Sequence, residues 1–198
     1  MIDKVPDSFD RVGYDLNNHA IHALIDIRDN VESLPDRVSE EEYKSYKGLP
    51  PQSVTSFVRF GCSFGGKFEN GYARGKAADG TARNYWAETK RNALKQSPKI
   101  QNVQFICDSY ENLSFENTLI YCDPPYAGTS GYKTGAFDHE KFFEWCRGQA
   151  KNNNIVFVSE YNAPDDFECV WQGEIKTNFA SNRKSATHNA IEKLFRVK

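Results

Sequence analysis

The sequence predicts an α/β domain in which helices cross over between the strands of a mainly parallel sheet. Short apolar segments that end in an acidic residue recur along the chain, as VGYD, FICD, LIYCD and VFVSE. Between the last two, HEKFFEWCRGQAKN has the spacing of an amphipathic helix. Alternation of strand, helix and strand is typical of such sheets. A chain of 198 residues is long enough to bury a core.

The first elements are a short strand that ends at Asp15 and a helix that follows it. Apolar residues at Ile21, Leu24 and Ile27 have approximately helical spacing. Asn17 or Asn18 is suited to cap this helix, because its side chain can accept a hydrogen bond from a free backbone N–H. A charged connection follows, with a short helix expected over residues 40–47.

Glycine and aromatic residues alternate with basic residues in the next part of the chain. Residues 59–99 hold nine Lys or Arg against three Asp or Glu, although the whole chain has a net charge of −2. A helix is expected from about Asn84 to Lys95. We therefore divide the chain into residues 1–47, an inserted basic module over residues 48–100, and residues 101–198.

Basic side chains can neutralise phosphates, and glycine lets the backbone approach a nucleic acid closely. The DNA-binding candidates in the basic module are Arg59, Lys67, Arg74 and Arg83. For the basic residues of the expected helix, such as Lys90 and Lys95, a solvated helix face is an equally good interpretation.

Four acids lie at the ends of expected strands, namely Asp15, Asp108, Asp123 and Glu160. Ligands gather at the carboxyl ends of parallel strands, so these acids predict a shared site. The alternative is that each one forms a turn or caps a helix, as Asp often does.

Composition indicates a cytoplasmic protein without a metal centre. No apolar run approaches the roughly 18 residues of a membrane span, and the start MIDKVPDSFD lacks the pattern of a signal peptide. Five scattered cysteines suggest neither a disulfide framework nor a zinc site. His19 and His22 have no third ligand in view, so no metal is expected.

The motif Asp123-Pro124-Pro125-Tyr126 is suited to chemistry on the exocyclic amine of adenine. The lone pair of that nitrogen is delocalised into the ring, which makes it a poor nucleophile. The Asp123 carboxylate and the Pro124 carbonyl could accept its hydrogens and stabilise the positive charge that develops during attack on a methyl group. Tyr126 could stack on the flipped base. The alternative is a Pro-Pro strand terminator with a packed tyrosine.

With this motif the chain resembles the Dam-like (D12) class of DNA adenine-N6 methyltransferases, which phages and restriction-modification systems often carry. The resemblance implies that S-adenosylmethionine is the cofactor, with Asp15 at its ribose and Asp108 at its adenine. It also implies that the basic module is the target-recognition region. Tyr132 and Lys133, in the loop after the motif, would contact the flipped nucleotide or a flanking phosphate.

One feature of that family, the Phe-x-Gly-x-Gly turn on the first strand, has no counterpart before Asp15. We therefore expect an incomplete Rossmann-like methyltransferase sheet. Either a separate N-terminal polypeptide completes it, or the chain is an inactive relative, or its start is incomplete. The unpaired edge would also invite a homodimer. Two functions stay open: methylation of adenine N6 in DNA, and a non-catalytic protein that binds DNA or inhibits a host nucleic-acid enzyme. Cytosine N4 offers a similar amine.

Overall fold

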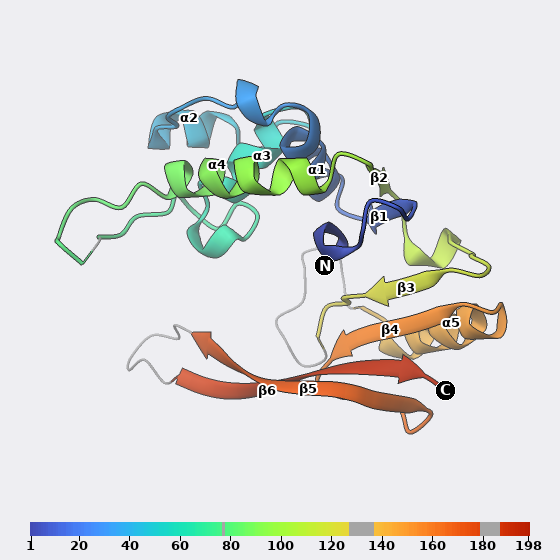
Figure 1. Cartoon of the computed structure of the whole chain (residues 1–198). Helices are drawn as coiled ribbons and strands as arrows, with labels where there is room; N and C mark the ends of the chain where they lie inside the picture. The colour runs from blue at the N-terminus through green and yellow to red at the C-terminus, as the bar shows by residue number, and fades with distance from the viewer. Residues whose placement is uncertain (77, 127–136, 179–186) are drawn as a thin grey trace. The chain divides into compact units, whose positions relative to one another are not determined.

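A computed structural model describes residues 1–76, 78–126, 137–178 and 187–198 of the chain (Figure 1). The chain forms two compact units, Met1–Tyr110 and Glu111–Lys198. We describe each unit by itself. Among the residues that the structure describes, no helix has the length and apolar character needed to cross a membrane.

The N-terminal unit is mainly helical and contains two strands. Its elements in chain order are η1 (Ile2–Lys4), β1 (Arg11–Asp15), α1 (Asn18–Asp29), η2 (Val31–Ser33), α2 (Glu40–Ser45), α3 (Thr55–Gly61), η3 (Phe64–Gly66), α4 (Tyr85–Gln96), η4 (Ser97–Lys99) and β2 (Val103–Cys107). A further short turn of helix, η5 (Tyr110–Asn112), lies where the two units meet in sequence.

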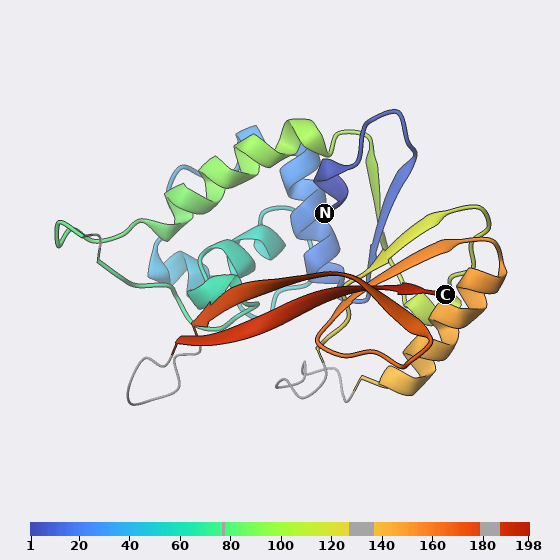
Figure 2. The same cartoon turned by 60° about the horizontal axis from the view of Figure 1, so that its bottom comes forward.

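The strands β1 and β2 pair in parallel, and Asp15 lies opposite Cys107. Helix α1 packs on this pair (Figure 2). Its start confirms the predicted cap, because the Asn17 side chain accepts a hydrogen bond from His19 N. The two strand ends that carry Asp15 and Asp108 are therefore neighbours in one sheet.

The predicted basic module contributes to the core of the N-terminal unit. Phe57 and Val58 from α3 and Trp86 from α4 are buried in one cluster with Ala23 and Ile27 of α1. Residues 48–100 therefore do not separate from residues 1–47 as a compact unit of their own in this structure. The three-segment division of the chain stays a prediction.

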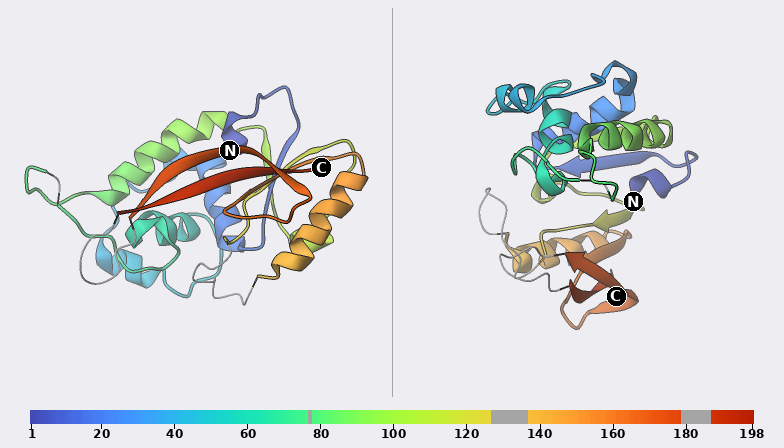
Figure 3. Two further views of the ribbon diagram at one scale, coloured as in Figure 1. Left: turned by 90° about the horizontal axis from the view of Figure 1, so that it is seen from below. Right: turned by 90° about the vertical axis from the view of Figure 1, so that its left-hand side faces the viewer.

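The described residues of the C-terminal unit form a four-stranded sheet and one α-helix. Its elements are β3 (Leu119–Cys122), α5 (His139–Lys151), β4 (Ile155–Glu160), β5 (Phe167–Asn178) and β6 (Thr187–Val197), and the strand order is β3-β4-β6-β5. The strands β3 and β4 are parallel, whereas β6 runs antiparallel to both β4 and β5. Helix α5 lies along β4 (Figures 1 and 3).

The mixed α/β class is confirmed, with differences in detail. The described strands form one sheet in each unit, and a single methyltransferase-type sheet stays a prediction. Helix α3 and strand β5 are absent from the elements that the sequence predicts. Five of the seven residues of α3 are buried, and three of these are polar (Thr55, Ser56 and Arg59), so the pattern of polarity does not mark the buried face.

A buried carboxylate fixes the chain where it enters α3. Asp26 is 1% exposed, and its oxygens accept hydrogen bonds of 2.8 Å from Ser53 Oγ and from Val54 N. Val54 has a φ of 66°, which is an unfavourable conformation for a β-branched residue. The interactions with Asp26 therefore hold a strained turn in place.

We expect Asp26→Ala to lower the free energy of unfolding by roughly 3 kcal/mol, because a buried N–H loses its charged acceptor and the strained turn loses its support. Urea denaturation followed by circular dichroism measures this. Asp29→Ala is the control on the same helix. Asp29 is exposed and pairs with Arg28 at the surface, so its loss should cost less than about 1 kcal/mol. Equal losses for the two variants would contradict the role of Asp26.

Candidate active site

The Asp-Pro-Pro-Tyr motif begins one residue after β3 ends. Proline has no N–H to donate to a neighbouring strand, so β3 cannot continue its pairing with β4 beyond this point. Pro124 is buried, whereas Asp123 is exposed. The motif therefore leaves the sheet at the carboxyl end of a parallel strand, with its acid accessible to solvent.

Tyr126 is half-buried, and its hydroxyl points to groups from two other strands. The phenol donates a hydrogen bond of 2.7 Å to Glu192 Oε1 on β6 and lies 3.2 Å from Ser159 Oγ on β4. Its ring meets that of Tyr161 edge-on, with 4.7 Å between centroids. These contacts fix both the hydroxyl and the plane of the ring.

His139, the first residue of α5, holds the other proline of the motif. Its Nε2 lies 2.9 Å from the Pro125 carbonyl oxygen, a distance that suits an N–H donor. The same nitrogen is 3.4 Å from Oε1 of Glu160, whose side chain is buried at the end of β4. Since the Pro125 carbonyl accepts from His139, the Pro124 carbonyl is the better candidate to accept from a substrate amine.

The electrostatic environment of Asp123 favours its neutral form more than water does. Partial desolvation raises the pKa of the Asp123 carboxyl, and the nearby carboxylates of Glu192 and Glu160 raise it further. A hydrogen bond with Tyr126 acts in the opposite direction. An acid with a raised pKa in a loop of this kind is a candidate for a functional group.

Asp15 and Asp108 form a second acidic pair, in the N-terminal unit. Asp15 is the exposed last residue of β1, and its Oδ1 accepts a hydrogen bond of 2.7 Å from Asn17 N. Desolvation raises the pKa of the Asp15 carboxyl despite that bond. Asp108 follows β2 directly and is half-buried. The adjacent strand ends bring these two predicted residues together.

The four strand-end acids thus belong to two pairs, one in each unit. The C-terminal unit places Glu160 near the motif, and it adds His139, Ser159 and Glu192, which the sequence prediction lacks. No local motif distinguishes Glu192 or Ser159 in the sequence. The pairing of β3 with β4 brings Ser159 to Tyr126, and the pairing of β6 with β4 brings Glu192 there.

Of the predicted DNA-binding residues, Arg59 lies in the interior of the N-terminal unit. It is 4% exposed, and its guanidinium pairs with Glu69 at 2.8 Å and donates to the Leu49 carbonyl at 2.6 Å. It also lies over the ring of Phe68. A phosphate would have to displace these partners, so we leave Arg59 out of the proposed DNA-binding residues.

The other basic candidates are exposed. Lys67 follows η3 in a glycine-containing turn. Arg74 pairs with Glu40, and Arg83 donates two hydrogen bonds of 2.6 and 2.7 Å to Glu88. These surface pairs are accessible to a phosphate that competes with the carboxylates. Tyr132 and Lys133, the remaining two candidates, lie outside the described residues.

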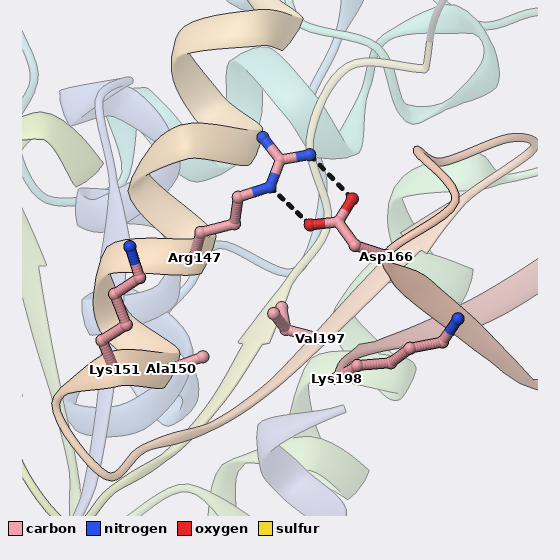
Figure 4. A pocket seen from close by; sticks show the side chains of 6 residues that line it. All are labelled: Arg147, Ala150, Lys151, Asp166, Val197 and Lys198. Atoms are coloured by element: carbon pink, nitrogen blue, oxygen red, sulfur yellow. Dashed lines mark hydrogen bonds and ion pairs between the residues drawn. The ribbon is translucent and has the colours of Figure 1, made fainter.

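Two other features of the described residues bear on the choice of site. No group of three or more His, Cys, Asp or Glu among them is arranged to hold a metal ion. A hollow in the C-terminal unit is lined by Arg147, Ala150, Lys151, Asp166, Val197 and Lys198 (Figure 4). Arg147 pairs there with Asp166, and no residue of the motif contributes to the lining.

A mixed α/β fold that presents an acid, two prolines and a tyrosine at the end of a parallel strand fits a methyltransferase. Comparison with protein families identifies the family. The model of the D12 class N6 adenine-specific DNA methyltransferases matches residues 68–167, which is half of the chain. The chain belongs to this family.

A curated relative shows a shorter similarity. The type II methyltransferase M.FokI of Planomicrobium okeanokoites is 43% identical to this chain over 54 residues. These residues make up 25% of this chain and 8% of that protein. The chain therefore matches only a small part of the length of this relative.

We expect His139→Ala to loosen the motif, because the Pro125 carbonyl loses its donor. Hydrogen exchange of the Tyr126 amide should become faster in this variant, as read by mass spectrometry of the peptide that contains it. His22→Ala is the matched control, since His22 lies on α1 in the N-terminal unit. Unchanged exchange in His139→Ala, with the fold intact, would show that the contact has no positioning role.

Proposed function

We propose that the chain transfers a methyl group from S-adenosylmethionine to N6 of adenine in DNA. The observation that carries this proposal is the geometry of the Asp-Pro-Pro-Tyr loop, together with membership of the D12 family. Asp123 is exposed at a strand end, whereas Pro125 and Tyr126 are held by partners from α5 and β6. This combination of an accessible acid and a fixed loop suits the activation of an amine.

The chain's own groups would act on the target amine. The Asp123 carboxylate and the Pro124 carbonyl would accept its two N–H bonds and stabilise positive charge as the new N–C bond forms. As this bond forms, the bond between the methyl group and the sulfonium sulfur would break, with the bonding pair left on sulfur, and the methylated nitrogen would then give up one proton to solvent. Tyr126 would brace the plane of the flipped base, which offsets part of the stacking that the base loses on leaving the duplex. Pro125 would keep the loop rigid.

The acids at the ends of β1 and β2 fit the proposed cofactor. Carboxylates accept hydrogen bonds from ribose hydroxyls and from an adenine amine, and Asp15 and Asp108 are placed at neighbouring strand ends to do so. When bound, S-adenosylmethionine supplies a sulfonium-linked methyl group. Asp15 would hold the ribose hydroxyls, and Asp108 would hold the adenine.

Strand edges in both units support the proposal that a further polypeptide takes part. Among the described strands, β1 pairs with β2 alone and β3 pairs with β4 alone. An edge strand presents N–H and C=O groups that another strand can pair with, and Leu119 at the start of β3 is 62% exposed. A separate N-terminal polypeptide would supply that strand and the glycine turn, whereas a second copy of the chain would pair with the strand edge alone.

We expect Asp123→Ala and Asp123→Asn to lower the rate of methyl transfer by at least about 10²-fold, because the developing positive charge loses its carboxylate partner. Transfer of radiolabelled methyl groups to unmethylated DNA measures the rate. DNA affinity and thermal unfolding should stay unchanged, since Asp123 is exposed. Asp165→Ala, at another exposed acid of the same unit, is the control.

Full activity of Asp123→Asn would overturn the proposed role of the acid. Absence of transfer and of cofactor binding by calorimetry, both for the chain alone and with a polypeptide that carries the glycine turn, would favour the alternative of a non-catalytic DNA-binding protein.

We further propose that Lys67, Arg74 and Arg83 contact DNA phosphates. Lys67→Ala should then weaken binding to all duplex sequences alike and reduce the slope of log K against log salt concentration by about 0.9, the value expected for the loss of one phosphate contact. Fluorescence anisotropy at several salt concentrations measures this slope. Lys4→Ala, at a lysine whose side chain is 71% exposed in the same unit, should leave it unchanged. Equal slopes for the unmodified chain, Lys67→Ala and Lys4→Ala would show that Lys67 makes no phosphate contact.

A further inference from the structure

A second carboxylate lies beside the Asp-Pro-Pro-Tyr loop, on the last strand of the C-terminal unit. Glu192 on β6 is half-buried, and its Oε1 accepts hydrogen bonds from Tyr126 at 2.7 Å and from Ser159 at 3.2 Å. Hydroxyls from the loop and from β4 thus converge on one oxygen. The sequence separates Tyr126 and Glu192 by 66 residues.

The neighbours of Glu192 lie on both adjacent strands. On β5 its cross-strand partner is Gly173, and the ring of Trp171 lies so close to that glycine that an added Cβ would come within 2.5 Å of the ring. On β4, Ser159 is 4% exposed and donates to the Glu192 carboxylate. The hydrogen bonds from Tyr126 and Ser159 therefore restrict the Glu192 side chain.

The Tyr126 hydroxyl also links Glu192 to Asp123. Tyr126 hydrogen bonds with the Asp123 carboxylate, which lowers the pKa of Asp123, whereas the charge of Glu192 raises it. Burial raises the pKa of Tyr126 itself well above its ordinary value, and the hydrogen bond to Glu192 adds to this effect. The phenol consequently stays neutral, and its one O–H donates to only one of the two carboxylates at a time.

From this geometry we infer that Glu192 is a positioning residue of the amine site, which holds the Tyr126 ring and makes Asp123 a stronger hydrogen-bond acceptor through its nearby negative charge. The role of Glu192 at an amine site rests on the proposed function. A more basic carboxylate forms stronger hydrogen bonds to the N–H groups of an amine that gains positive charge. Glu192 need not touch the substrate.

Within the C-terminal unit, other titratable groups also face Asp123. Glu160 at the end of β4 acts in the same direction as Glu192 but is the weaker of the two. Tyr121 on β3 hydrogen bonds with Ser159, and burial raises the pKa of its phenol, so it too remains neutral. Among the described residues of this unit, Glu192 combines a negative charge near Asp123 with a hydrogen bond to Tyr126 of the motif.

Two variants separate the charge of Glu192 from general loosening of the loop. Glu192→Gln removes the charge but keeps an oxygen that can accept from Tyr126, so the titration of Asp123 should move to lower pH. Tyr126→Phe removes the bond that stabilises the Asp123 carboxylate, so the titration should move to higher pH. If either substitution merely loosened the loop, the pKa of Asp123 would return toward the ordinary pKa of an aspartate. Both titrations would then move to lower pH.

The measurement is a pH titration of the Asp123 carboxyl carbon by NMR in the full chain labelled with ¹³C-aspartate, with Asp123→Asn used for assignment. Glu168→Gln is the matched control, because Glu168 is exposed on β5 opposite Arg196. Glu168→Gln should leave the pH titration of Asp123 unchanged. Opposite shifts for Glu192→Gln and Tyr126→Phe support the inference. An unchanged titration in Glu192→Gln, or shifts of the same sign, would overturn it.

The titration needs neither cofactor nor DNA, so its outcome is independent of methyl transfer. A chain that fails to methylate but shows opposite shifts would contradict the proposed function and leave the coupling of Glu192 to Asp123 standing. In an active chain, the acidic limb of the pH profile for kcat/KM should also move to lower pH in Glu192→Gln. An active variant whose profile is unmoved would count against the inference.

Discussion

The candidate site depends on the point at which β3 must stop pairing. Two consecutive prolines offer no N–H groups to β4, so the chain has to leave the sheet directly after Cys122. Because β3 and β4 are parallel, this exit lies beside the carboxyl end of β4, where Glu160 is buried. Because β6 is antiparallel to β4 and Lys193 lies opposite Glu160, the preceding residue Glu192 reaches the same edge. One local constraint thus gathers side chains from three strands around Asp123.

The loop is then held on two sides by different chemistry. The imidazole of His139 bonds the backbone at Pro125, whereas the Glu192 carboxylate bonds the side chain of Tyr126. Fixing a backbone carbonyl and an aromatic plane before substrate arrives reduces the reorganisation that a reaction requires. Asp123 precedes both anchored residues in the chain and remains exposed to solvent. That division, with rigid neighbours and an accessible acid, is the physical basis for the proposed action on an amine.

The N-terminal unit shows that a basic sequence is not the same as a surface of free positive charge. Arg59 is enclosed by Glu69, a carbonyl group and an aromatic ring, and Arg83 is bonded to Glu88. Lys67, in contrast, stands in an exposed turn. The contribution of such a segment to DNA binding depends on which Lys and Arg side chains can leave their carboxylate partners in the chain and bind phosphates instead. Membership of the D12 family makes that distinction relevant to target recognition.

The sequence by itself determined the features that depend on neighbours in the chain. These include the α/β class, the end of β1 at Asp15, the Asn17 cap, the helix α5 and the exposed acid of the Asp-Pro-Pro-Tyr motif. Only the tertiary structure decided that Arg59 is buried, that α3 is a helix inside the core, and that His139, Ser159 and Glu192 meet the motif. Burial and cross-strand contact arise between residues far apart in sequence, and no local pattern of polarity or spacing specifies them.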